Sequence, residues 1–162
     1  MSRIIVHGTF LAFVASTFIA ITLRINPRIW LQDYPQDIQD RVPPKNAQER
    51  RVSLLLGIPF LILLLAVPFA STLTLKYQRG GAVPFLPLFA NGFGVSFVFN
   101  LVDWLLLDWL MFCTITPSFV VIPGTEGAEG YNDYAFHFRG FLIGTAFSAV
   151  AGIASAGLTL LL

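Results

Sequence analysis

Two aspartates interrupt the most continuous apolar stretch of the chain. Asp103 and Asp108 lie within residues 97–110, a segment whose other residues, apart from Asn100, are aliphatic or aromatic. A carboxyl group in hydrocarbon is costly, so it usually faces a protein interior, a partner charge or a water-filled cavity. Residues of this kind pair with cations, bind ligands or carry ions, and the two aspartates are therefore the leading candidates for a functional site.

Three residues at the start of the last apolar segment join this candidate site. Asp133, His137 and Arg139 follow the polar connection that leads out of the aspartate segment, so both groups are expected at one membrane face. Asp133 and His137 are neighbours on a helix because they are four residues apart, and a carboxylate suits a helix N-terminus. On an α-helix, Asp103 and Asp108 would lie about 140° apart around the axis, which predicts different partners for them.

Three interpretations of these residues remain open. We favour an ion-pair and capping network, in which Arg139 neutralises Asp103 or Asp108 and Asp133 caps the last helix, since buried charges are normally paired. The second interpretation is a site for a metal ion or a polar ligand, with the carboxylates and His137 as ligands. No recognised metal-ligand spacing is present, so we assign no metal. The third is proton or ion translocation, with Asp103 as the carrier within the membrane.

A ligand site would require a shared pocket. Asp103, Asp108 and His137 would line it, and it would open toward residues 117–133, because polar groups at that depth need each other or water. The loop Gly124–Gly130 contains three glycines and would act as its lid. The sequence identifies no cofactor for such a site.

Composition decides the fold class. The 162 residues are 56% hydrophobic and 12% charged, with a mean hydropathy of +0.73, whereas soluble domains carry about 25% charged residues. A spanning helix needs about 20 apolar residues, and four segments provide them: residues 4–23, 52–75, 85–112 and 134–162. We predict an all-α integral membrane protein, a four-transmembrane-helix bundle that forms a single domain over residues 1–162.

The polar connection between the first two spans carries two local signals. Trp30 and Tyr34 give it an aromatic character typical of the membrane interface, and we expect a short interfacial helix there. Asn46, followed three residues later by Glu49, matches a capping box that starts the second long helix.

Small residues recur at every fourth position of the last span. This ridge comprises Gly140, Gly144, Ser148, Gly152 and Ala156. In lipid, such a ridge allows helices to approach closely. We expect it to pack against a helix of the bundle, of another copy or of another membrane protein.

Basic residues are distributed unequally between the two sides of a four-span protein. One side holds seven: Arg24, Arg28, Arg41, Lys45, Arg50, Arg51 and Arg139. The other side holds three: Arg3, Lys76 and Arg79. The positive-inside tendency then predicts that both termini lie outside, in a multi-pass protein of the cell membrane.

The sequence constrains function less than it constrains fold. A net charge of +1 lacks the basic footprint of a nucleic-acid surface, and the expected surroundings are the lipid bilayer. We expect an accessory or structural helix-bundle protein that packs with other membrane proteins or with itself through the last helix. The alternatives are a small transporter or ligand-binding protein that uses Asp103, Asp108 and His137, and an interfacial enzyme acting on a lipid. No catalytic signature favours the enzyme.

Overall fold

Four long helices dominate the structure, a computed structural model that describes residues 2–162 and contains no strand in that range. They are α1 (Ser2–Ile25), α3 (Ala47–Gln78), α4 (Phe85–Val102) with its continuation η2 (Asp103–Ile115), and α5 (Tyr134–Leu161). Each of the four is long and apolar enough to cross a membrane. The predicted all-helical fold with four such segments is confirmed.

The α3 helix begins where the capping box predicted. The Asn46 side chain accepts a hydrogen bond from the Glu49 backbone at 2.9 Å, and the Glu49 carboxylate accepts one from the Asn46 backbone at 2.8 Å. These two bonds satisfy amide groups that have no partner within the helix.

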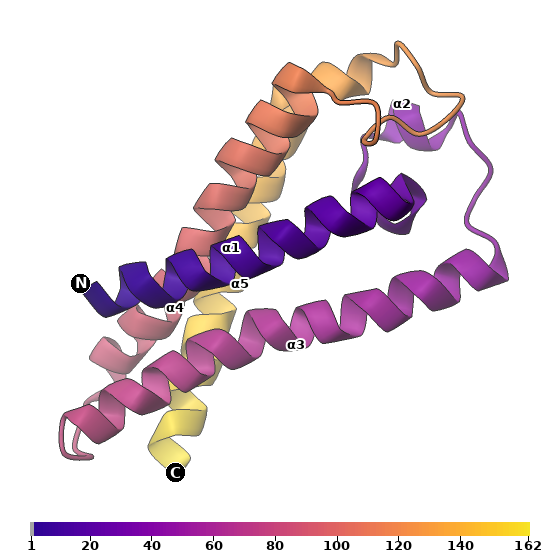
Figure 1. The fold of residues 1–162 in the computed structure, drawn as a ribbon. Helices are drawn as coiled ribbons and strands as arrows, with labels where there is room; N and C mark the ends of the chain where they lie inside the picture. Colours follow the sequence, from indigo (N-terminus) through magenta and orange to yellow (C-terminus); the bar gives the residue numbers. More distant parts are fainter. Residues whose placement is uncertain (1) are drawn as a thin grey trace.

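The long helices pack around one central pair, α4 and α5. α4 and α5 lie against each other, α1 and α3 cross this pair, and the N-terminal end of α3 diverges from it (Figure 1). Only 6% of the residues in the most apolar stretch of α3 are buried, compared with 22%, 33% and 28% in the other three helices. The α4–α5 pair therefore forms the centre of the fold, whereas α3 lies at its edge.

The small-residue ridge of α5 lies mainly in the contact with α4. A Cβ atom added to Gly144 would collide with the Asn100 side chain, and one added to Gly152 would lie 2.9 Å from the Phe93 backbone nitrogen. Ala156 and Ser148 are buried on the same face. Gly140 is different, because an added Cβ would contact nothing within 4 Å. The ridge therefore packs within the chain, and Gly140 does not belong to this contact.

Two short helices, rather than one, connect α1 to α3. They are η1 (Pro27–Asp33) and α2 (Gln36–Gln39), and Pro35 separates them. Tyr34 lies at the junction and is only 2% exposed. It packs inside the protein, whereas the sequence suggested an aromatic side chain at the interface.

The connection between η2 and α5 packs against these short helices. Tyr34 donates a hydrogen bond to the Val120 carbonyl at 2.8 Å, and the Gly130 backbone donates one to Asp37 at 2.9 Å. The Tyr131 hydroxyl accepts a hydrogen bond from the Ile122 backbone at 2.9 Å. The loop predicted to be a flexible lid is thus held in a small apolar core with its own hydrogen bonds.

Candidate functional site

A buried histidine and a membrane aspartate form the centre of the candidate site. His137 Nδ1 lies 3.0 Å from Asp108 Oδ1. The histidine is 5% exposed, whereas the Asp108 side chain is 27% exposed. The second imidazole nitrogen, Nε2, is buried and has no hydrogen-bond partner among the described residues. One carboxylate therefore orients the imidazole and also connects it with the protein surface.

The helix that carries the aspartates is not an α-helix at this point. Residues Asp103–Ile115 form a π-helix, in which hydrogen bonds join residues i and i+5. Residues five apart therefore lie one turn apart, which brings Asp103 and Asp108 toward one side of the helix. Trp104 and Trp109 show the same register, with ring centroids 4.6 Å apart. The expected separation of about 140° is wrong, because it assumed α-helical geometry.

The π-helix ends at a threonine with an unusual backbone conformation. Thr116 has φ of 44° and ψ of 60°, the left-handed region that β-branched residues rarely adopt. Its backbone nitrogen donates a hydrogen bond to the Met111 carbonyl at 2.9 Å, and its hydroxyl donates one to Phe112. These bonds hold the last turn in the i to i+5 pattern, directly beyond the Asp108–His137 pair.

Two further carboxyl groups, those of Asp103 and Asp33, lie in the surroundings of Asp108. Within residues 2–162, no lysine or arginine nitrogen lies within 4.0 Å of these three carboxylates. The pKa of Asp33 is raised above its usual value, first by partial burial and also by the charge of Asp108, while Lys45 and Gln32 oppose the shift. Asp33, on η1, is itself exposed and lies at the border of this group.

The other two predicted site residues have separate positions. Asp133 accepts a hydrogen bond from the Phe136 backbone at 2.8 Å, so it caps α5 as the sequence suggested. Arg139 is exposed and has no carboxylate oxygen within 4.0 Å in the described part of the chain. The predicted pairing of Arg139 with a membrane aspartate is wrong. Two residues after His137, it lies on the opposite side of the helix.

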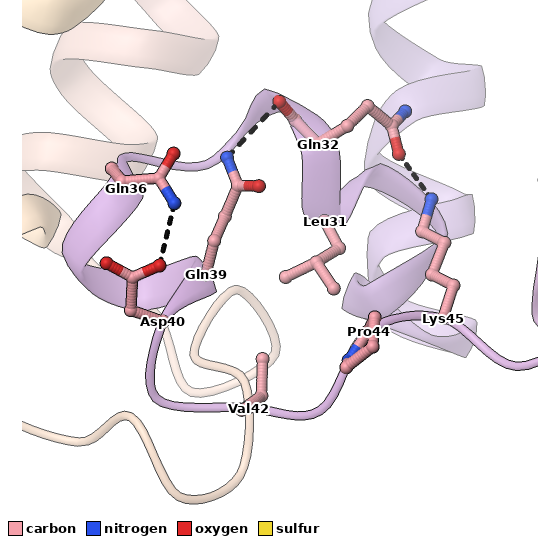
Figure 2. A pocket seen from close by; sticks show the side chains of 8 residues that line it. All are labelled: Leu31, Gln32, Gln36, Gln39, Asp40, Val42, Pro44 and Lys45. Carbon is pink, nitrogen blue, oxygen red and sulfur yellow. Dashed lines mark hydrogen bonds between the residues drawn. The ribbon is translucent and has the colours of Figure 1, made fainter.

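Two open grooves lie on the loop-side surface, which the connections between α1 and α3 and between η2 and α5 form. One, of 660 Å³, is bordered by Arg139 together with Asp37, Glu129 and Asp133. The other, of 390 Å³, lies beside η1 and α2. Figure 2 shows that its polar side chains bond to one another or to nearby backbone: Gln36 to Asp40, and Lys45 to Gln32. Neither groove is lined by Asp103, Asp108 or His137, so neither is the pocket that the sequence analysis predicted.

A second polar cluster lies near the opposite end of the helices, and the sequence analysis missed it. His7 Nδ1 lies 2.7 Å from the Ser71 hydroxyl, and Asn91 Nδ2 donates hydrogen bonds to Ser71 at 2.9 Å and Thr72 at 3.2 Å. The cluster joins α1, α3 and α4. Asn91 offered a signal, because an asparagine in an apolar segment commonly bonds across helices.

Comparisons do not assign this arrangement to a known family. No protein-family model, curated protein or solved structure matches the chain. Within residues 2–162, no three histidine, cysteine, aspartate or glutamate side chains are placed to hold a metal ion. The functional argument therefore depends on the geometry of the chain itself.

Proposed function

We propose that this chain is a multi-pass membrane protein that binds and releases protons through the Asp108–His137 pair at one face of the bilayer. The four long apolar helices support insertion in a membrane. The excess of basic residues on the loop side supports a cell-membrane orientation with this face inside and both termini outside.

This proposal rests on the buried imidazole of His137. One ring nitrogen, Nδ1, is paired with Asp108, and the other, Nε2, has no hydrogen-bond partner among the described residues. Nδ1 of His137 faces the Asp108 carboxylate, so Nε2 is the position where a proton is gained or lost. A carboxylate on Nδ1 fixes the tautomer of the ring and stabilises the imidazolium. Asp108 is partly exposed, so the pair reaches the protein surface.

The surrounding carboxyl groups suit this role. Asp103 lies one π-helical turn deeper than Asp108, and Asp33 adds charge from η1. A proton that enters this group meets carboxyl groups that form no ion pair with a lysine or arginine in the described residues. Asp103 is the carboxyl group placed to carry the proton further into the membrane.

The test is nitrogen NMR of histidine-labelled protein in lipid nanodiscs, where only two histidines give signals. We expect neutral His137 to carry its proton on Nδ1 and to bind a second proton at Nε2 when the sample is acidified over a range of pH. Asp108→Ala should shift the neutral ring toward the other tautomer, because the acceptor at Nδ1 is gone.

The matched control is Glu129→Ala, which removes an exposed carboxylate from the same face. It should leave the His137 signals unchanged. A His137 ring that keeps one protonation state over this range, or a tautomer that Asp108→Ala leaves unaltered, would contradict the proposal.

A specific observation favours a second function, an accessory role in which α3 packs against another membrane protein. α3 is the least covered long helix, and Leu55 and Ile58 on it are 71% and 56% exposed. The ridge on α5 is already occupied by α4, so α3 replaces it as the proposed contact.

Purification in mild detergent tests this second function. We expect a membrane-protein partner in fixed ratio, and we expect it to be lost from the double variant Leu55→Ala with Ile58→Ala. The control pair is Leu142→Ala with Ile143→Ala, which removes similar exposed apolar area from α5. A chain that purifies alone, or a partner that both double variants retain equally, would exclude α3 as the contact.

A further inference from the structure

The larger of the two grooves carries charges of both signs. One guanidinium, three carboxylates and one aromatic ring border its 660 Å³: Arg139, Asp37, Glu129, Asp133 and Phe136. Ligand sites commonly have volumes of about 300–1,000 Å³. Within residues 2–162, none of these charged groups lies within 4.0 Å of an opposite charge. The groove therefore presents a cation and carboxylates that form no ion pairs with the rest of the described chain.

The smaller groove differs in this respect. Its lysine, Lys45, bonds to the Gln32 side chain and to the Ile29 carbonyl, and its carboxylate, Asp40, accepts a bond from Gln36 (Figure 2). The chain itself supplies partners for both charges. The larger groove is therefore the better candidate for a ligand that is not part of the chain.

The mixture of charges indicates the kind of ligand. A purely anionic ligand would meet three carboxylates and only one arginine, and a purely cationic ligand would leave Arg139 without a counter-charge. A ligand that carries both a phosphate and a protonated amine satisfies both kinds of group. Arginine binds phosphate with two parallel hydrogen bonds, and an ammonium group donates charge-assisted hydrogen bonds to a carboxylate.

Asp37 is the carboxylate held in position for the amine. It is half-buried, and its Oδ2 accepts the hydrogen bond from the Gly130 backbone at 2.9 Å. A side chain that is already ordered loses less conformational entropy when a ligand binds. Asp133 is occupied in capping α5, and Glu129 is exposed. We therefore place the amine at Asp37.

An exposed apolar face of α5 continues from the groove. Ile143, Phe147 and Val150 follow Arg139 by four, eight and eleven residues, so they lie on the same side of the helix. Their exposed fractions are 59%, 68% and 59%. Beside this face, a Cβ added to Gly140 would contact nothing within 4 Å, so the surface is open there. A ligand in the groove that carries an acyl chain could lay the chain along this face.

We propose that this groove binds the headgroup of a phosphatidylethanolamine, a membrane lipid with one phosphate and one primary amine. The phosphate pairs with Arg139, the ammonium group pairs with Asp37, and an acyl chain lies along Ile143 and Phe147. Arg139 and His137 lie on opposite sides of α5, so this site is separate from the Asp108–His137 pair. It shares with the proposed function only the insertion of the chain in a bilayer.

Native mass spectrometry of the delipidated full chain in detergent tests the site. The probes are phosphatidylethanolamine, phosphatidylcholine and phosphatidylglycerol with identical acyl chains. We expect one phosphatidylethanolamine to bind about tenfold more tightly than either of the other lipids. The trimethylated amine of phosphatidylcholine cannot donate a hydrogen bond to Asp37, and phosphatidylglycerol has no cation to balance the carboxylates. Glycerophosphoethanolamine, which lacks acyl chains, should bind more weakly than the lipid.

Two substitutions separate the roles of the charged groups. Arg139→Ala should weaken the binding of phosphatidylethanolamine about tenfold, because the phosphate loses its partner. Asp37→Asn keeps an acceptor for the Gly130 amide and removes the charge, so it should abolish the preference for phosphatidylethanolamine over phosphatidylcholine. Arg51→Ala is the matched control, since it removes an exposed arginine from α3 outside the groove, and it should leave binding unchanged. Thermal unfolding in lipid-free detergent verifies that each variant is folded.

The outcomes distinguish this site from the proposed function. Equal binding of the three lipids, or equal effects of Arg139→Ala and Arg51→Ala, would overturn the lipid site. Glycerophosphoethanolamine that binds as tightly as the lipid would also overturn it, because the acyl chain would then contribute nothing. These results leave the titration of His137 untouched, and a His137 that fails to titrate leaves the lipid site standing.

Discussion

Gly144→Leu is expected to separate α5 from α4 and to cost about 3 kcal/mol in the free energy of unfolding. Any side chain at this position collides with Asn100. The Asn100 amide would then lose its bonds to Phe141 and Thr145 and remain buried without partners. Thermal or denaturant unfolding in detergent measures the loss.

Gly140→Leu is the control for this substitution. It makes the same change one turn earlier on α5, where an added Cβ contacts nothing within 4 Å. We expect this variant to unfold at the same temperature or denaturant concentration as the wild-type protein. Equal loss at both positions would mean that α5 does not pack on α4 through the face described.

His137→Leu is expected to destabilise the bundle by about 2 kcal/mol, because the partly exposed Asp108 carboxylate loses its imidazole partner. Asp108 would remain next to Asp103 and Asp33 without its imidazole partner. The double variant Asp108→Leu with His137→Leu should recover much of this loss, because neither partner is then left alone.

The control is Arg139→Ala, which lies two residues further along α5. Arg139 is exposed and contacts no carboxylate in the described residues, so its removal should change the unfolding temperature little. A larger loss for Arg139→Ala than for His137→Leu would restore the ion pair that the sequence suggested and would contradict the structure.

Helix positions followed from local sequence, whereas the pairing at the site did not. Apolar length located four helices, and the Asn46–Glu49 capping box and Asp133 marked two of their starts. Both capping signals depend on residues within one turn of each other, and apolar length depends on one continuous segment. Such local information was sufficient to predict where the four helices lie and where two of them begin.

The geometry of the site depends on the π-helical backbone of Asp103–Ile115, which no local sequence signal predicted. The segment from Asp103 reads as an ordinary apolar helix, and its π form is accompanied by long-range contacts, including Asp108 with His137 and Trp104 stacked on Phe141 at 4.4 Å. The α-helical assumption therefore gave the wrong register for the two aspartates. It also left Arg139 as the apparent partner, because charge alone cannot reveal which side of α5 faces η2.

The length of α3 has a mechanical consequence in a bilayer. Its 32 residues form a helix about 48 Å long, whereas the hydrocarbon core of a membrane is about 30 Å thick. Its apolar part, residues 52–75, is about 36 Å long, so in a membrane the helix would tilt to match, and the tilt would change with lipid chain length. Because α3 diverges from the α4–α5 pair at one end (Figure 1), a thicker membrane would draw it upright and a thinner one would spread it further. In a bilayer, the angle between α3 and the α4–α5 pair would therefore be set partly by the lipid, and membrane thickness would alter this protein's conformation.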